Sequence, residues 1–216
     1  QSFSSYDFES KGGISSNLTD EAFKSNVDLA KKHCARGDVF QLVLSKKFQQ
    51  NFKGDDFNVY RALRSINPSP YLFYFDYGEF KIFGSSPEAQ LVVQDQNAEI
   101  HPIAGTFART GDDLKDAELA KKLVADKKEN SEHVMLVDLA RNDLSRHCTE
   151  VVVKKYREVQ FFSHVIHLVS KVMGKVRKNT PTMQIVADTF PAGTLSGAPK
   201  YKAMELIEAY EKTSRA

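Results

Sequence analysis

The sequence has little cysteine, no long apolar run and almost no net charge. Two cysteines, Cys34 and Cys148, are too few for a disulfide framework or a zinc site of four thiolates, so a reduced, cytosolic setting is expected. The longest apolar runs, such as Val134–Val137, fall far below the ~18 residues that a membrane-spanning helix needs. Lys and Arg number 30 against 28 Asp and Glu, and the two signs are interleaved. The resulting net charge of +2 excludes a strongly electrostatic nucleic-acid binder.

What is present is the composition of a globular protein, with 41% hydrophobic and 27% charged residues among 216. This length suits one large domain or two small ones. Residues 1–18 are polar and rich in Ser and Gly, which predicts a flexible lead-in or linker without the apolar segment of a secretory signal. The chain starts with Gln rather than Met, so we expect it to be a piece of a longer protein.

Apolar periodicity predicts helices and strands that are grouped along the chain rather than strictly alternating. The expected strands cover residues 39–48, 71–77, 80–83, 91–93, 99–103, 151–156 and 159–172. The expected helices cover residues 19–37, 59–66, 113–124, 129–144, 183–190 and 200–212. This order indicates the α+β class.

Two glutamates and a histidine open one of these helices. Glu129, Glu132 and His133 stand at positions i, i+3 and i+4, so both carboxylates can reach a common point on one helix face. A solvated acidic first turn, favoured by the helix dipole, explains the glutamates as well. The next residues, Val134–Val137, make the helix apolar on nearly all sides, which predicts burial. Buried carboxylates need a partner, and Mg²⁺ takes oxygen ligands, so a magnesium site and a solvated helix start remain two alternatives.

Two histidines lie in an apolar, β-rich run. His164 and His167 are three residues apart, which on a strand places them on opposite faces, so they cannot chelate one ion together. The spacing therefore excludes a zinc-type pair. Each histidine is either a satisfied core residue or a functional one.

Three turns are built from small residues. The loop at residues 191–199 leads into a helix, and such loops let the backbone approach an anionic ligand. Its spacing departs from a phosphate-binding loop, because Ala198 and Pro199 follow Gly197 where that motif has Lys at once. A tight connection between elements is the alternative. The turns at residues 84–88 and 104–106 have ordinary turn composition.

Eight short segments in a fixed order are more specific than any one motif. They are Gly37–Ser45, Asn67–Tyr71, Gly84–Glu88, Pro102–Thr106, Lys128–His133, Asp138–Asp143, Ser163–His167 and Gly193–Lys200. In order and spacing they resemble the chorismate-utilising enzymes, most closely the anthranilate synthase component I family, from about residue 20 to the C-terminus. The resemblance implies an α+β fold with two large antiparallel sheets packed together and flanked by helices. Residues 19–216 would be a partial chorismate-binding catalytic domain that lacks its C-terminal part and is inactive by itself.

The resemblance also implies a magnesium-dependent reaction. Ammonia adds to chorismate, the 4-hydroxyl leaves, and pyruvate is eliminated to give anthranilate, a step of tryptophan biosynthesis. Glu132 matches a direct Mg²⁺ ligand and Glu129 an outer one. Glu88 matches the acid near the departing hydroxyl, where a partly buried pocket would raise its pKa. His167 matches the histidine that faces the substrate.

Further positions match substrate contacts or separate related enzymes. The matched contacts are Gly105, Thr106, Gly193 and Thr194. Isochorismate and salicylate synthases carry a water-activating lysine where this chain has Gln41, which favours ammonia as the nucleophile. Many 4-amino-4-deoxychorismate synthases carry a nucleophilic lysine where this chain has Ala104. That synthase, of the folate pathway, and a non-catalytic fragment are the alternative readings.

The resemblance finally implies partners. A glutamine amidotransferase subunit would supply the ammonia, in the cytoplasm. The segment Asn67–Tyr71 matches one that contacts the feedback inhibitor tryptophan, although Pro68 and Pro70 also explain it as a helix stop and strand entry. No nucleic acid or membrane partner is expected.

Overall fold

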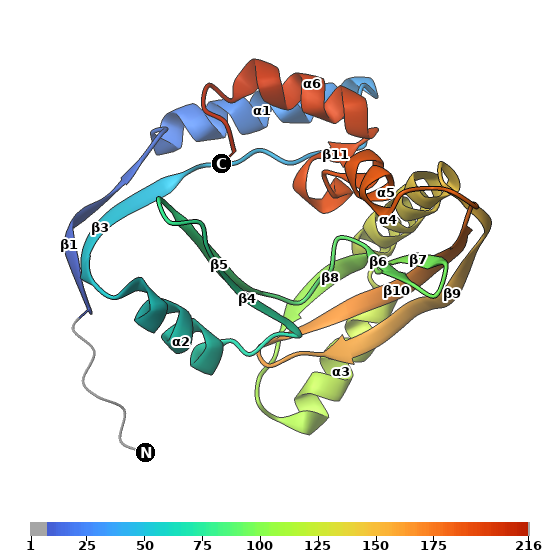
Figure 1. Cartoon of the computed structure of the whole chain (residues 1–216), viewed down its shortest axis with the longest axis horizontal. Helices are drawn as coiled ribbons and strands as arrows, with labels where there is room; N and C mark the ends of the chain where they lie inside the picture. The colour runs from blue at the N-terminus through green and yellow to red at the C-terminus, as the bar shows by residue number, and fades with distance from the viewer. Residues whose placement is uncertain (1–7, 216) are drawn as a thin grey trace. The chain divides into compact units, whose positions relative to one another are not determined.

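The computed structural model describes residues 8–215 (Figure 1). The chain divides into two compact units, one made of Gln1–Ala62 with Pro191–Ala216 and the other of Leu63–Phe190. The helix α2 (Asp56–Ile66) runs through the boundary. The sequence predicts one catalytic domain over residues 19–216, and this boundary stays a prediction.

The first unit begins with a strand where the sequence predicts a flexible lead-in. β1 (Phe8–Ser16) pairs antiparallel with β3 (Phe48–Gly54), so the prediction is wrong for residues 8–16, and residues 1–7 lie outside the described residues. Every residue of β1 is exposed, so no apolar alternation marked it. Backbone pairing and the stacked rings of Phe8 and Phe52, 5.2 Å apart, hold it instead.

Two helices and a short strand pair complete the first unit. α1 (Asp20–Arg36) starts at the cap residue Thr19 and ends at Gly37, whose φ of 80° is left-handed, as its sequence predicts. β2 (Gln41–Leu42) pairs with β11 (Gly197–Ala198), so only two residues of the predicted strand 39–48 lie in this ladder. The short 3₁₀ helix η1 (Gly193–Leu195) precedes β11, and α6 (Lys200–Tyr210) follows it. The core of the unit consists of Val39, Ala203 and Leu206.

The second unit is built on β10 (Val165–Val176), the central strand of a five-stranded sheet. β9 (Cys148–Phe161) pairs along its length. β7 (Asn97–Ile100) and β8 (Ile103–Ala108) pair with successive halves of it, and β6 (Val92–Gln94) extends β7. A separate hairpin joins β4 (Tyr71–Asp76) and β5 (Lys81–Ser86), as predicted.

These pairings confirm the α+β class with antiparallel sheets. The described residues form one five-stranded sheet and three two-stranded sheets, whereas the resemblance implies two large sheets.

Helices pack against the five-stranded sheet. α3 (Asp113–Ala125) and α4 (Lys127–Ser145) contact β8, β9 and β10, and α5 (Thr182–Thr189) contacts α4 (Figure 1). α4 buries one side only: Leu136, Val137, Ala140 and Leu144 are buried, while Val134 is 43% exposed. The prediction that this helix is apolar on nearly all sides is therefore wrong, because four consecutive apolar residues span a whole turn and one of them must face outward. None of the helices that the structure describes is long and apolar enough to cross a membrane.

Candidate active site

A β-bulge at Gly105 brings several of the predicted site residues together. In the pairing of β8 with β10, Thr106 stands opposite His167 and Ala104 opposite Leu168, which leaves Gly105 as the extra residue. Its φ is +73°, a conformation that glycine adopts without steric cost. The bulge turns the Gly105 carbonyl out of the ladder and toward a side chain of β10.

That side chain is His167, and its hydrogen bond defines the tautomer of the ring. His167 Nδ1 lies 2.9 Å from the Gly105 carbonyl oxygen and 3.3 Å from Thr106 Oγ1. A carbonyl oxygen can only accept, so Nδ1 carries the proton and Nε2 of the neutral ring keeps its lone pair. The rings of Phe162 and His167 make an edge-to-face contact at a centroid distance of 5.3 Å. The Gly105 carbonyl thus fixes which nitrogen of the neutral His167 ring carries the proton.

The helix α4 places Glu129 against the same glycine. A Cβ added at Gly105 would lie 3.4 Å from Glu129 Oε2, an ordinary contact, but only 2.8 Å from Leu123 Cδ1, so the carboxylate adjoins Gly105 and Leu123 is what an added side chain would collide with. Asp126 caps the helix by accepting from the backbone N–H groups of Lys128 and Glu129. The Glu129 side chain is 18% exposed, and its ion pair with the exposed Lys128 adds little because solvent screens it. Gly105 is therefore the point at which β8, His167 and Glu129 meet.

Glu132 stands one turn along the same helix and is partly buried. Two carboxylates one turn apart form a hard oxygen donor set, which fits Mg²⁺. Mg²⁺ demands about six oxygen ligands and keeps several waters, so this pair is suited to supply part of its shell. Among residues 8–215 there is no group of three or more His, Cys, Asp and Glu that could hold a metal ion.

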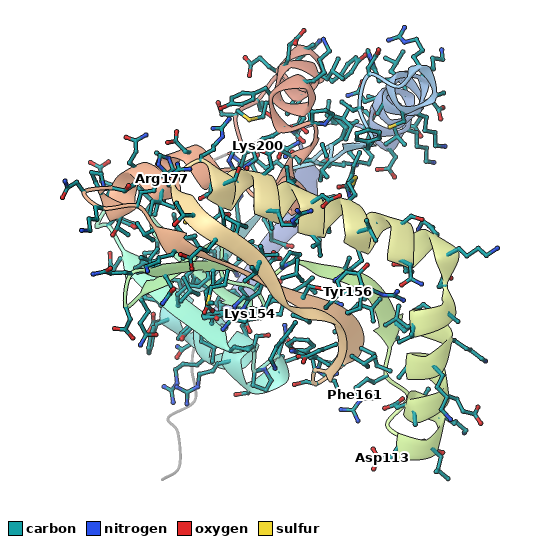
Figure 2. The ribbon with its side chains drawn as sticks, turned by 90° about the vertical axis from the view of Figure 1, so that its right-hand side faces the viewer. Asp113, Lys154, Tyr156, Phe161, Arg177 and Lys200 are labelled. Carbon is teal, nitrogen blue, oxygen red and sulfur yellow. The ribbon has the colours of Figure 1, made fainter. Side chains whose placement is uncertain are left out.

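His133 does not join the two glutamates. It is completely buried against β10, where its Nε2 lies 2.6 Å from Ser170 Oγ, and its ring makes an edge-to-face contact with that of Tyr156 (labelled in Figure 2). The same hydroxyl accepts from the backbone N–H of Arg157. Burial, and then the charge of Arg157, lower the pKa of His133 to about 4, so the ring is neutral. Sequence spacing grouped His133 with the acids, whereas the structure makes it the buried link between α4 and β10.

Glu88 lies beyond the end of β5 in an environment that favours its protonated form. Burial raises the pKa of its carboxyl to about 7, compared with 4.5 for an ordinary glutamate. Ser86 Oγ accepts from the Glu88 backbone N–H and donates to the Glu88 carbonyl. The side chain of Gln90, two residues after Glu88, donates to the carbonyl of Thr189 in α5. A carboxyl with this pKa can donate a proton near neutral pH, as the acid that Glu88 matches must do.

The remaining predicted residues lie in the first unit. Gln41 pairs with Ala198 across β2 and β11, and Gly193 and Thr194 form the helical turn that precedes β11. A Cβ at Gly197, whose φ is +136°, would lie 2.1 Å from the Gln41 carbonyl oxygen. The small-residue loop is thus a close backbone contact beside Gln41, and Gly193 is buried within it.

The predicted residues fall into one set in each unit. Gly105, Thr106, Glu129 and His167 are in contact within the second unit, and Glu88 and Glu132 belong to that unit as well. His164 lies in the turn before β10, where its Nε2 donates to the carbonyl of Ile66. Only His167 lies on β10, so the prediction that the two histidines occupy opposite faces of one strand is wrong.

A carboxyl acid with a raised pKa, a histidine of defined tautomer and two helix carboxylates are typical of an enzyme that moves protons on a small molecule. The chain matches the model of the chorismate binding enzyme family over residues 4–216, and it belongs to that family.

Individual relatives are similar along most of the chain. It is 45% identical over 202 residues to anthranilate synthase component 1 of Aquifex aeolicus and 45% identical over 213 residues to that of Bacillus subtilis. These alignments cover 93% and 98% of this chain and 41% of each relative. The chain therefore spans about two-fifths of the length of the curated relatives it matches.

Solved structures share the fold. The crystal structure of anthranilate synthase component I from Streptococcus pneumoniae superposes with a TM-score of 0.86 and 40% identity, over 94% of this chain and 45% of that one. The menaquinone-specific isochorismate synthase of Escherichia coli superposes with a TM-score of 0.88 over 100% of this chain and 50% of that one. Its identity is 22%, so that likeness concerns the fold alone.

Proposed function

We propose that the protein containing this chain is an anthranilate synthase component I, which aminates chorismate with ammonia and eliminates pyruvate to give anthranilate. The observation that carries the proposal is the meeting of His167, Thr106 and Glu129 at the Gly105 bulge, where three elements from distant parts of the sequence converge. The similarity to anthranilate synthases of three bacteria supports the choice of reaction within the family.

Two groups move protons in this proposal. Glu88, protonated near neutral pH because it is buried, donates a proton to the departing 4-hydroxyl. His167 faces the substrate with Nε2, whose lone pair accepts a hydrogen bond or a proton, while Gly105 and Thr106 hold Nδ1. Thr106, Thr194 and the backbone of Gly193 contact the substrate.

Glu129 and Glu132 would hold Mg²⁺. Glu132 would be the direct ligand and Glu129 an outer one, and the ion would supply positive charge for the carboxylate of chorismate. The position of Glu129 next to Gly105 supports this arrangement, because it puts the carboxylate beside the strand that carries Thr106.

The identities of Gln41 and Ala104 distinguish the proposed reaction from those of related enzymes. Glutamine is not the cation or base that would activate water, so Gln41 favours ammonia over water addition. Ala104 is buried and offers no amine, which disfavours the covalent route of many 4-amino-4-deoxychorismate synthases. We further propose a glutamine amidotransferase subunit as the ammonia source, tryptophan as an inhibitor at Asn67–Tyr71, and a cytoplasmic location, for which the two free cysteines are suited.

Product analysis tests the proposal. The full-length protein is incubated with chorismate, Mg²⁺ and an ammonium salt, and the products are separated by chromatography. We expect anthranilate and pyruvate in equal amounts, and loss of both in Glu132→Ala. Recovery of 4-amino-4-deoxychorismate or isochorismate in place of anthranilate would overturn the assignment.

A further inference from the structure

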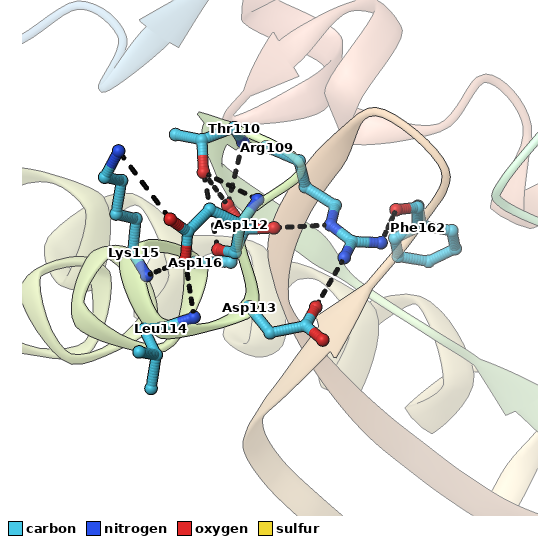
Figure 3. Close-up of polar contacts among 8 residues, drawn as sticks. All are labelled: Arg109, Thr110, Asp112, Asp113, Leu114, Lys115, Asp116 and Phe162. Carbon is cyan, nitrogen blue, oxygen red and sulfur yellow. Dashed lines mark hydrogen bonds and ion pairs between the residues drawn. The ribbon is translucent and has the colours of Figure 1, made fainter.

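A buried carboxylate lies at the start of α3, outside the cluster at Gly105. Asp116 is 1% exposed, and its Oδ1 accepts from the backbone N–H and the hydroxyl of Thr110 at 2.7 and 2.9 Å. Its Oδ2 accepts from Arg109 Nε at 2.8 Å (Figure 3). These donors hold the pKa of Asp116 below its usual range, the backbone hydrogen bond of Thr110 first. Asp116 is thus an ionised group fixed by several donors.

Arg109 extends this network to the turn between β9 and β10. Its Nη1 donates to the Phe162 carbonyl at 3.2 Å, and its guanidinium carbon lies 5.7 Å from the centre of the Phe161 ring. Its backbone N–H donates to the carbonyl of His164. Figure 2 shows Phe161 at the tip of the β9–β10 ribbon, on the same side of the unit as Asp113 at the start of α3. Arg109 therefore contacts the turn at three residues, Phe161, Phe162 and His164.

The turn between β9 and β10 also contacts His167. The Phe162 ring packs edge-on against His167, with 66° between the ring planes. The ring of His167 is thus bounded by Gly105 and Thr106 at Nδ1 and by the Phe162 ring. A shift of the turn would move Phe162 and remove the ring contact.

We propose that Asp116 and Arg109 are positioning residues for His167, acting through the Phe162 turn. This inference rests on the proposed function, because it concerns how His167 is aimed at the substrate. The planar guanidinium is what the role requires, since it donates to a carboxylate and a carbonyl in two fixed directions at once. Misplacement of a catalytic group by about 1 Å can cost on the order of a hundredfold in rate.

A matched pair of variants tests the proposal. Asp113 also approaches Arg109, at 3.6 Å, but its side chain is 99% exposed. Asp116→Asn and Asp113→Asn therefore make the same chemical change beside the same guanidinium. In the full-length protein we expect Asp116→Asn to lower kcat about tenfold to a hundredfold with KM changed less than about threefold, and Asp113→Asn to match the wild type.

A second readout does not depend on turnover. In protein labelled with ¹⁵N-histidine, and assigned by comparison with His167→Gln, the His167 nitrogen signals report which ring nitrogen holds the proton. We expect the Nδ1-protonated pattern in the wild type and in Asp113→Asn, and a mixture of tautomers in Asp116→Asn. This readout also separates the two claims, since it would succeed even if the product were not anthranilate.

Arg109→Lys is a conservative variant that separates a positioning role from a loss of folding. An ammonium keeps the charge beside Asp116 but lacks the planar fork whose separate nitrogens bond Asp116 and the Phe162 carbonyl in two fixed directions. We expect a folded protein with the same tautomer mixture and a reduced kcat. An unchanged His167 spectrum and unchanged kcat in Arg109→Lys or in a folded Asp116→Asn would overturn the proposal.

Discussion

Gly105→Ala is expected to lower both stability and activity, and different contacts of Gly105 account for each loss. The positive φ of Gly105 disfavours any side chain by about 1–2 kcal/mol. The added methyl would also lie 2.8 Å from Leu123 Cδ1, well inside the ~3.5 Å of an ordinary carbon contact. Leu123 is completely buried in a cluster with Ile166 and Leu168, so it has little room to move. Overpacking of this kind costs about 1–3 kcal/mol.

Gly111→Ala provides the control, because Gly111 has a similar φ of +80° and nothing within 4 Å of an added Cβ. We therefore expect a loss of about 2–5 kcal/mol in the free energy of unfolding for Gly105→Ala and about 1–2 kcal/mol for Gly111→Ala. Activity should fall at least about tenfold in Gly105→Ala only, since Glu129 and the carbonyl that holds His167 both adjoin the methyl.

Urea unfolding of the two full-length variants, followed by fluorescence, and anthranilate formation measure these quantities. Equal losses of stability and activity in the two variants would show that Leu123 and Glu129 do not lie against Gly105. The reasoning about the bulge would then be refuted.

Three further predictions concern single side chains. Because the pKa of Glu88 is raised, the native state holds a proton between pH 4.5 and about 7 that the unfolded chain has lost, so the free energy of unfolding should fall by at most about 3 kcal/mol as the pH rises over that range. The urea midpoint of Glu88→Gln should lack this fall. An identical pH dependence in the variant and the wild type would contradict the raised pKa. Ser170→Ala leaves His133 and the Arg157 N–H without their partner and should cost about 2–4 kcal/mol in urea unfolding, whereas Ser145→Ala, at an exposed hydroxyl, should cost under about 0.5 kcal/mol. Gln41→Lys should lower ammonia-dependent turnover, because a cation would stand where ammonia approaches; unchanged turnover would argue against Gln41 facing the substrate.

The regular elements were predictable because their signals are local. The apolar stripe of α1 with its cap at Thr19 and Gly37, and the aromatic hairpin β4–β5, need only neighbouring residues to be recognised. β1 was missed because it pairs across 30 or more residues and buries none of its side chains. Such a strand carries no alternation to read.

The candidate site was likewise predictable only where its signals are local. The spacing of Glu129 and Glu132 indicated a shared helix face, but which residues of that helix are buried depends on the sheet beneath it. His133 was therefore grouped with the acids, although it bonds Ser170, 37 residues away. The bulge at Gly105 was also hidden, because a glycine in a strand pattern does not say which carbonyl it will turn outward.

One comparison tests most directly whether the cluster at Gly105 is the reaction site. His167 and His164 are three residues apart, but His167 bonds the bulge while His164 bonds the carbonyl of Ile66. The rate of anthranilate formation from chorismate, Mg²⁺ and ammonium should be measured for His167→Gln and His164→Gln in the full-length protein. We predict a loss of at least about a hundredfold for His167→Gln and less than about threefold for His164→Gln. Equal rates in the two variants, or a greater loss in His164→Gln, would contradict the account.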